Sequence, residues 1–116
     1  IKPPYSVNNA AEEALIASLE DKEYLLRNVN SIIKERDEVF NILNEIPNLK
    51  VYPSNANFIL IEFDEKEPAN IYEELCMKGI FVRSYSSKRL KNCIRVSIGT
   101  SEEMNTFTNA LTEIIR

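Results

Sequence analysis

The segment from about Lys22 to Asn44 constrains the fold of this chain more than any other part of it. Apolar side chains recur there at three- and four-residue spacing, with charged side chains between them; the apolar set is Leu25, Leu26, Val29, Ile32, Ile33, Phe40 and Leu43. This period predicts a long amphipathic helix. Such a stripe needs a sheet or a second helix to cover it.

Another helix is predicted before this one, and strands and further helices are predicted after it. A short helix is expected before it, with Asn9 as its N-cap and a break at Glu20–Asp21. The other predicted elements are strands at Val51–Tyr52, Asn57–Phe63, Ile80–Arg83 and Cys93–Ile98, a helix at Ala69–Lys78 closed by Gly79, and a last helix behind a Thr100–Glu103 capping box. The apolar run Asn57–Phe63 is expected to be covered on both faces. The predicted fold is α+β, a small mostly antiparallel sheet with helices packed on one face.

Composition limits the function classes. The 116 residues suit a single domain over residues 1–116, and a net charge of -4 does not favour nucleic-acid or acidic-membrane binding. The chain has no histidine, so it cannot by itself build a histidine general base or a His-containing metal site, and no metal site is expected. Cys76 and Cys93 lie far apart and are expected to be buried reduced thiols. Without a signal-peptide or membrane-span pattern, a cytoplasmic location is the default expectation.

Two arginines are the candidate binding residues. In the strand Cys93–Ile98, Ile94, Val96 and Ile98 are expected to face the helices, which sends Arg95 to the other face. Arg83 ends the preceding strand and would converge on the same place if the two strands pair. Two convergent guanidiniums suit a phosphate or carboxylate, because each presents a planar fork of donors. From spacing alone, both are equally well ordinary surface arginines of a sheet edge.

The order of these segments resembles the C-terminal part of pyridoxal-phosphate aminotransferases, histidinol-phosphate aminotransferases most of all. The stretches that carry the resemblance cover essentially the whole chain; they are PPYSVNNAAEEAL, SNANFILIE, GIFVRSY and NCIRVSIGTSEE. The resemblance implies that the chain is the C-terminal small domain of such an enzyme. The large cofactor-binding domain would then lie outside this sequence, as expected for a truncated piece that starts at Ile1.

The resemblance also assigns residue roles. Substrate binding is implied for Arg95, Arg83, Asn57, Tyr5 and Asn8, with the arginine pair holding the phosphate of histidinol phosphate or the carboxylates of glutamate. A local backbone-bonding role for Asn57 and a capping or hinge role for Tyr5 and Asn8 stay open. No catalytic or cofactor-binding residue is expected in this chain. Lys88 follows a serine, as the family's Schiff-base lysine does, but the family's motif does not continue after it, so Lys88 is expected to be a solvated loop residue.

For the complete protein, the implied activity is transamination between histidinol phosphate and 2-oxoglutarate in histidine biosynthesis. Its cofactor would be pyridoxal 5'-phosphate, its lysine would lie outside this chain, and the parent would be a homodimer with no nucleic-acid or membrane partner. The 116-residue chain alone is expected to be inactive. Two alternatives stay open, namely an enzyme similar to threonine-phosphate decarboxylase and a free-standing α+β module that binds small anions.

Overall fold

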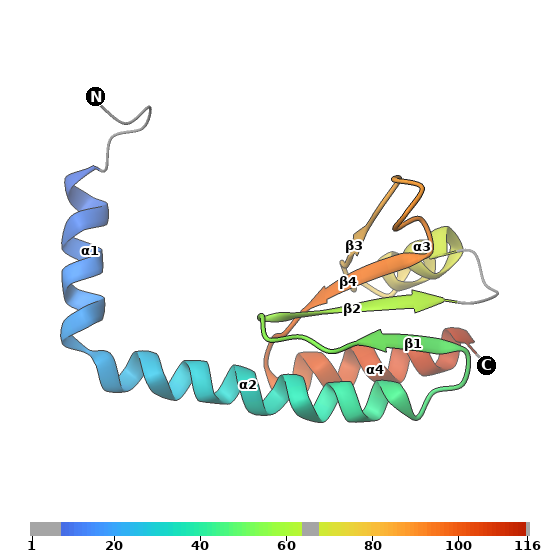
Figure 1. Cartoon of the computed structure of the whole chain (residues 1–116), viewed down its shortest axis with the longest axis horizontal. Helices are drawn as coiled ribbons and strands as arrows, with labels where there is room; N and C mark the ends of the chain where they lie inside the picture. Colours follow the sequence, from blue (N-terminus) through green and yellow to red (C-terminus); the bar gives the residue numbers. More distant parts are fainter. Residues whose placement is uncertain (1–7, 64–67, 116) are drawn as a thin grey trace. The chain divides into compact units, whose positions relative to one another are not determined.

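The computed structural model describes residues 8–63 and 68–115 and has the predicted α+β architecture (Figure 1). Within these residues, four helices accompany one antiparallel sheet with strand order β1-β2-β4-β3. The chain divides into two compact units, residues 1–31 and residues 32–116. That residues 1–116 act as a single domain stays a prediction. In the described ranges, no helix is long and apolar enough to cross a membrane.

The first unit holds α1 (Asn9–Glu20) and the start of α2 (Lys22–Asn44). The predicted bounds of α2 are confirmed, whereas those of α1 differ by one residue because the predicted N-cap is wrong by one residue. Asn8, and not Asn9, is extended and accepts a hydrogen bond from the Ala11 backbone N–H through Oδ1 at 2.7 Å. In this half of α2 the apolar stripe has no cover from the described residues, since Leu25, Leu26 and Val29 are all exposed.

The second unit is built around the sheet. Its strands are β1 (Leu49–Tyr52), β2 (Phe58–Phe63), β3 (Arg83–Ser84) and β4 (Cys93–Ser97), and every neighbouring pair is antiparallel. The predicted strand Ile80–Arg83 is largely wrong, because only Arg83 of that range joins the ladder. Two-sided cover of β2 is also wrong. Ile59, Ile61 and Phe63 are buried, while the alternate positions of β2 are only half-buried.

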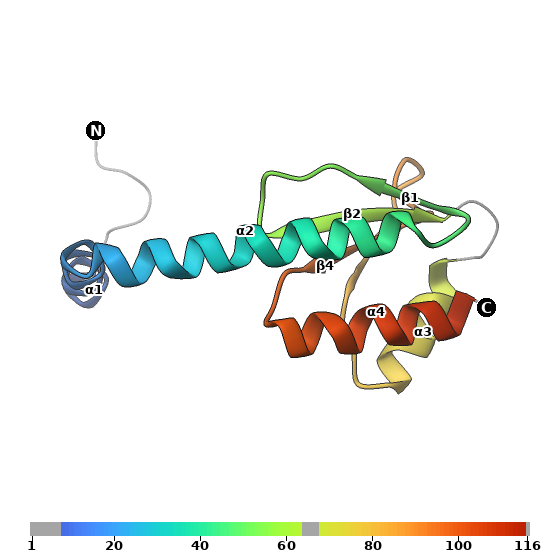
Figure 2. The same ribbon diagram turned by 90° about the horizontal axis from the view of Figure 1, so that it is seen from below.

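All the core helices lie on one face of this sheet (Figure 2). The α2 residues Val39 and Leu43 pack there with residues of α3 (Pro68–Met77) and α4 (Ser101–Ile115). The sheet side of the core is Val51, Ile59, Ile61, Phe63, Ile94 and Val96, and the helix side adds Ile71, Leu75, Met104, Phe107, Ala110 and Leu111. The predicted orientation of β4 is therefore confirmed for Ile94 and Val96. Cys93 is buried as expected, whereas Cys76 is only half-buried.

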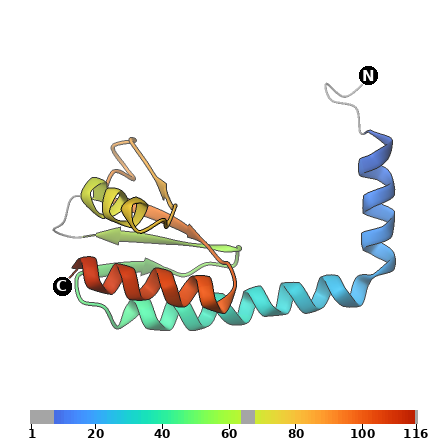
Figure 3. The same ribbon diagram turned by 180° about the vertical axis from the view of Figure 1, so that it is seen from behind.

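Local hydrogen bonds cap the end of α3 and the start of α4. After α3, seen in Figure 3, Gly79 has φ +78°, and the backbone N–H groups of Gly79 and Ile80 donate to the Cys76 and Leu75 carbonyls, both at 2.9 Å. At the start of α4, the Thr100 N–H donates to Glu103 Oε2 at 2.7 Å, and the Glu103 N–H donates to Thr100 Oγ1 at 3.3 Å. This confirms the predicted capping box.

Candidate anion-binding site

Arg83 and Arg95 lie directly opposite each other on paired strands. The antiparallel β3–β4 ladder sets Arg83 against Arg95 and Ser84 against Ile94. Directly paired residues project from the same face of a sheet, and Ile94 belongs to the helix-covered core, so both arginines project from the other face. We call this face the outer face; its residues are Lys50, Tyr52, Phe58, Leu60, Glu62, Arg83, Cys93, Arg95 and Ser97. Pairing of the two strands thus brings the predicted arginines together.

Arg95 is half-buried and lacks a full set of partners. Its guanidinium carbon lies 5.0 Å from the centre of the Phe58 ring, a cation–π arrangement that fixes the direction of the side chain. The Nε atom is buried and has no hydrogen-bond partner among the described residues. A buried donor without a partner is unfavourable, and an anion bound on the outer face would satisfy it. Leu60, the β2 residue directly opposite Arg95, offers no competing acceptor.

Arg83 is more exposed than Arg95. Its guanidinium carbon lies 6.0 Å from the Tyr85 ring centre, at the limit of a cation–π contact. Among the described residues, neither Arg83 nor Arg95 lies within ion-pair distance of a carboxylate. Two like charges directly opposite on neighbouring strands are unfavourable. The two positive charges therefore have no ion-pair partner among the described side chains.

A second polar cluster occupies the β1–β2 side of the outer face. The Tyr52 hydroxyl donates to Glu62 Oε2 at 2.5 Å, and Lys50 Nζ lies 3.4 Å from the same oxygen. Lys50 Nζ also lies 4.8 Å from the Tyr52 ring centre. The Tyr52 hydroxyl lowers the pKa of the Glu62 carboxyl most, and the Lys50 ammonium lowers it further, because both stabilise its charged form. Glu62 is therefore ionised at neutral pH and held towards β1.

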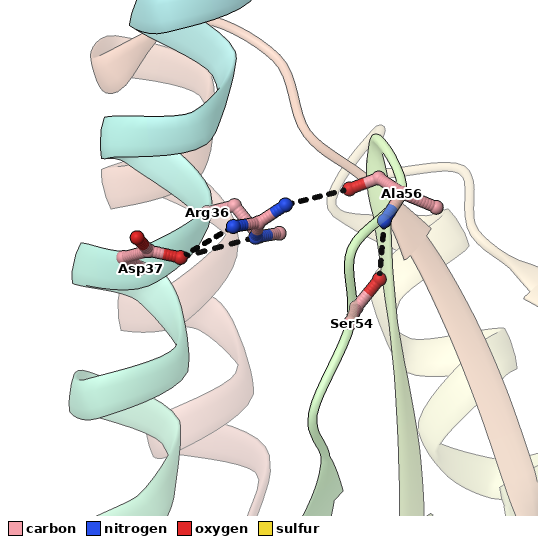
Figure 4. A network of polar contacts seen from close by, with 4 residues as sticks. All are labelled: Arg36, Asp37, Ser54 and Ala56. Carbon is pink, nitrogen blue, oxygen red and sulfur yellow. Dashed lines mark hydrogen bonds and ion pairs between the residues drawn. The ribbon is translucent and has the colours of Figure 1, made fainter.

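The turn before β2 places Asn57. Arg36 on α2 is bonded to Asp37 at 2.8 Å and donates from Nη1 to the Ala56 carbonyl at 3.5 Å, while the Ala56 N–H donates to Ser54 Oγ at 3.1 Å (Figure 4). The Asn57 carbonyl accepts from the Ile98 N–H at 2.8 Å, and its side chain is exposed. Asn57 precedes Leu60, the partner of Arg95, by three residues, or about 10 Å along the strand. Asn57 thus lies just before β2 and does not adjoin the arginines.

The other two predicted site residues lie in the N-terminal part of the sequence. Asn8 belongs to the first unit, where its side-chain oxygen caps α1, which is the capping role that the sequence left open. Tyr5 lies outside the described residues. The described geometry therefore supports a site made of Arg83 and Arg95, while contributions of Asn57, Tyr5 and Asn8 to binding stay predictions.

Several residues that shape this face were not singled out from the sequence. They are Phe58 beneath Arg95, the Tyr52–Glu62–Lys50 cluster, and Arg36 behind the turn. Alternation along the strands could have indicated the strand residues. Lys50 and Tyr52 are two residues apart, and Phe58 and Glu62 are four apart, so each pair lies on one face of its strand. Arg36 carried no such signal, since a charged residue on the polar side of a helix is ordinary.

No lysine in the described residues suits a covalent imine with a cofactor. That chemistry needs a sheltered amine with a lowered pKa. Every lysine in the described residues is exposed, Lys88 included. Lys50 has a raised pKa, because Tyr52 and Glu62 stabilise its ammonium. The described residues thus do not fit covalent attachment of such a cofactor, and the chemistry that this face offers is anion binding.

Comparisons with known proteins show which family this chain resembles. The sequence profile of the family "Aminotransferase class I and II" matches residues 1–111. A histidinol-phosphate aminotransferase of Ruminiclostridium cellulolyticum is 40% identical over 111 residues, which are 95% of this chain and 30% of that protein. The chain therefore spans about a third of the length of the relatives it matches.

Two solved structures show the same fold. The histidinol-phosphate aminotransferase of Clostridium acetobutylicum matches 98% of this chain and 35% of its own with a TM-score of 0.86 at 26% identity. That of Sinorhizobium meliloti, solved in complex with pyridoxal-5'-phosphate, matches 100% of this chain and 32% of its own with a TM-score of 0.81 at 29% identity.

Proposed function

The chain belongs to the class I and II aminotransferase family, and we propose that its arginine pair anchors the anionic group of the substrate in a histidinol-phosphate:2-oxoglutarate transaminase. The observation that carries this proposal is the placement of Arg83 directly opposite Arg95, with neither guanidinium paired to a carboxylate in the described part of the chain. The 40% identical relative named for this substrate supports the choice of histidinol phosphate.

The role of the pair follows from its chemistry. Guanidinium groups stay protonated at physiological pH and bind phosphate or carboxylate through two parallel hydrogen bonds. Arg95 is held over Phe58 and has its Nε free to donate, so it is oriented before the anion arrives. The exposed Arg83 adds a second charge from the neighbouring strand. In this proposal the two arginines position the substrate, and its amine reacts elsewhere.

The remaining machinery is proposed for the complete protein. Pyridoxal phosphate would supply the electron sink for transamination and would be held by residues outside this sequence, in a larger domain and a homodimer. The described lysines do not fit that role, and the chain covers only 30% of its relative, which supports this division of labour. We keep Asn57, Tyr5 and Asn8 as proposed substrate contacts of that assembly.

The test is calorimetric binding of histidinol phosphate to the complete protein, beside its transamination with 2-oxoglutarate. Replacing Arg95 by methionine keeps length and apolar contact but removes the charge. Loss of a charge-assisted hydrogen bond is worth about 1.5–3 kcal/mol, so we expect Kd to rise about 10- to 100-fold. Arg95→Lys should recover only part of this, since lysine lacks the planar fork. Arg27→Gln is the matched control, because Arg27 pairs with Glu23 on α2.

An unchanged Kd in Arg95→Met would refute the anchoring role. If the complete protein transaminates nothing but releases CO2 from threonine phosphate, the decarboxylase alternative replaces the transaminase. If the 116-residue chain alone transaminates histidinol phosphate, the division between anchoring and chemistry is wrong.

A further inference from the structure

Glu62 is the only acidic residue in the four described strands, and it lies close to the arginine pair in the register of the sheet. It pairs with Cys93, two residues from Arg95 on the same face. Diagonal neighbours of this kind are within reach of long side chains. Lys50 lies directly opposite Glu62 on the other side, so the register allows Glu62 to pair either with Lys50 or with Arg95.

In the structure Glu62 contacts the β1 residues and not Arg95. Glu62 reaches towards β1, where Oε2 accepts from the Tyr52 hydroxyl at 2.5 Å and lies 3.4 Å from Lys50 Nζ. Arg95 reaches towards the other end of β2, with its guanidinium 5.0 Å from the Phe58 ring centre. The acid and the arginine thus diverge, although they start from neighbouring positions.

We propose that Tyr52 and Lys50 are positioning residues that hold the Glu62 carboxylate away from Arg95, so that Arg95 keeps its charge for the substrate anion. This inference rests on the proposed function, since it assigns a role only if Arg95 binds an anion. A carboxylate on Arg95 would occupy the same fork of donors and cancel the charge that a phosphate needs. The lowered pKa of Glu62 has the same cause, because the Tyr52 hydroxyl and the Lys50 ammonium stabilise its charged form.

A purely structural role for the cluster makes a different prediction. If Tyr52, Lys50 and Glu62 only joined β1 to β2, then breaking the cluster would weaken the sheet, and removing the Glu62 charge afterwards would not restore binding. If they hold Glu62 away from Arg95, removing that charge restores binding, since no competitor remains. Rescue by a third substitution therefore separates the two roles.

The experiment measures the Kd of histidinol phosphate for the complete protein by calorimetry in four variants. Lys50→Met with Tyr52→Phe removes both contacts to the Glu62 carboxylate while keeping side-chain size. We expect Kd to rise about fivefold, which is the effect of one competing ion pair near a protein surface. Glu62→Gln added to this double variant should bring Kd back to within about twofold of the original protein. Glu62→Gln alone should leave Kd within the same range, because the wild-type acid is already held elsewhere. The fourth variant is Arg95→Met.

The outcomes are distinct. A double variant that binds like the original protein, or one that Glu62→Gln does not rescue, overturns this inference. If Arg95→Met also binds normally, the proposed anchoring function fails as well; if Arg95→Met binds weakly, only the role of Tyr52 and Lys50 fails. Should the double variant not fold, Tyr52→Phe alone carries the test. Tyr52→Phe should raise Kd about twofold, and adding Glu62→Gln should restore the original Kd. If either result is absent, the inference is overturned.

Discussion

Arg83 and Arg95 occupy opposed positions on paired strands, an arrangement that lowers the stability of the sheet. We predict that Arg83→Glu stabilises the chain, because it turns a like-charge pair into an opposite-charge pair. The expected gain over Arg83→Gln is about 0.5–1 kcal/mol in the free energy of unfolding, measured by urea denaturation. The same substitution should weaken binding of histidinol phosphate, since the new carboxylate would compete for Arg95.

Arg83→Gln is the matched control, because it removes the charge and adds none. A stability gain that appears with glutamate and disappears in high salt would identify the cross-strand charge pair as its cause. Arg83→Glu variants that are less stable than Arg83→Gln would show that the two guanidiniums do not repel each other in this sheet.

Among the elements, α4 depends on Gly99, which precedes its capping box. A Cβ at Gly99 would collide with the Glu103 carboxylate, which accepts from the Thr100 N–H at 2.7 Å. We predict that Gly99→Ala displaces this carboxylate and lowers Tm by about 2–5 °C at pH 7, as expected for the loss of a helix cap. The measurement is thermal unfolding followed by circular dichroism.

The pH dependence of this loss has a definite sign. The Thr100 N–H lowers the pKa of Glu103 in the folded chain. The contribution of the ionised Glu103 carboxylate to stability is therefore complete above the ordinary pKa of a glutamate. It is lost as pH falls through the lowered pKa of the folded chain. The difference between the original chain and Gly99→Ala should shrink in acid, and Glu103→Gln should behave in the same way. A difference of constant size down to pH 2 would contradict this account.

At the scale of the whole molecule, stability is concentrated in the unit of residues 32–116. Leu43 of α2 is 0% exposed in the core, whereas Leu19 of α1 is 62% exposed. Leu43→Ala should lower the free energy of unfolding of the chain by about 2–4 kcal/mol, because it empties a packed site. Leu19→Ala, the same substitution in another helix, should change it by less than about 0.5 kcal/mol.

Urea denaturation of the 116-residue chain measures both variants under one condition. Equal losses from the two substitutions would mean that α1 is buried in solution, against the exposure of Leu15, Ile16 and Leu19 in this structure. A loss confined to Leu43→Ala would place the cooperative core in the second unit.

Much of this architecture was predictable because its causes are local. Three features depend only on neighbours within about four residues in the sequence. They are the bounds of α1 and α2, Gly79 after α3 and the Thr100–Glu103 capping box. The face of Arg95 followed equally from the alternation of side chains along one strand.

Non-local contacts decided the rest. Which strands pair, and hence that Arg83 meets Arg95, depends on backbone hydrogen bonds between distant segments. The same is true of the short β3, the one-sided cover of β2 and the exposed half of the α2 stripe. The direction of Glu62, towards Tyr52 and Lys50 and away from Arg95, is of the same kind. The sequence by itself determined the residue types, the helices and the alternation of strand faces, since these follow from short-range geometry. Only the tertiary structure decided which of those faces meet, because burial and charge pairing depend on segments that the chain brings together from a distance.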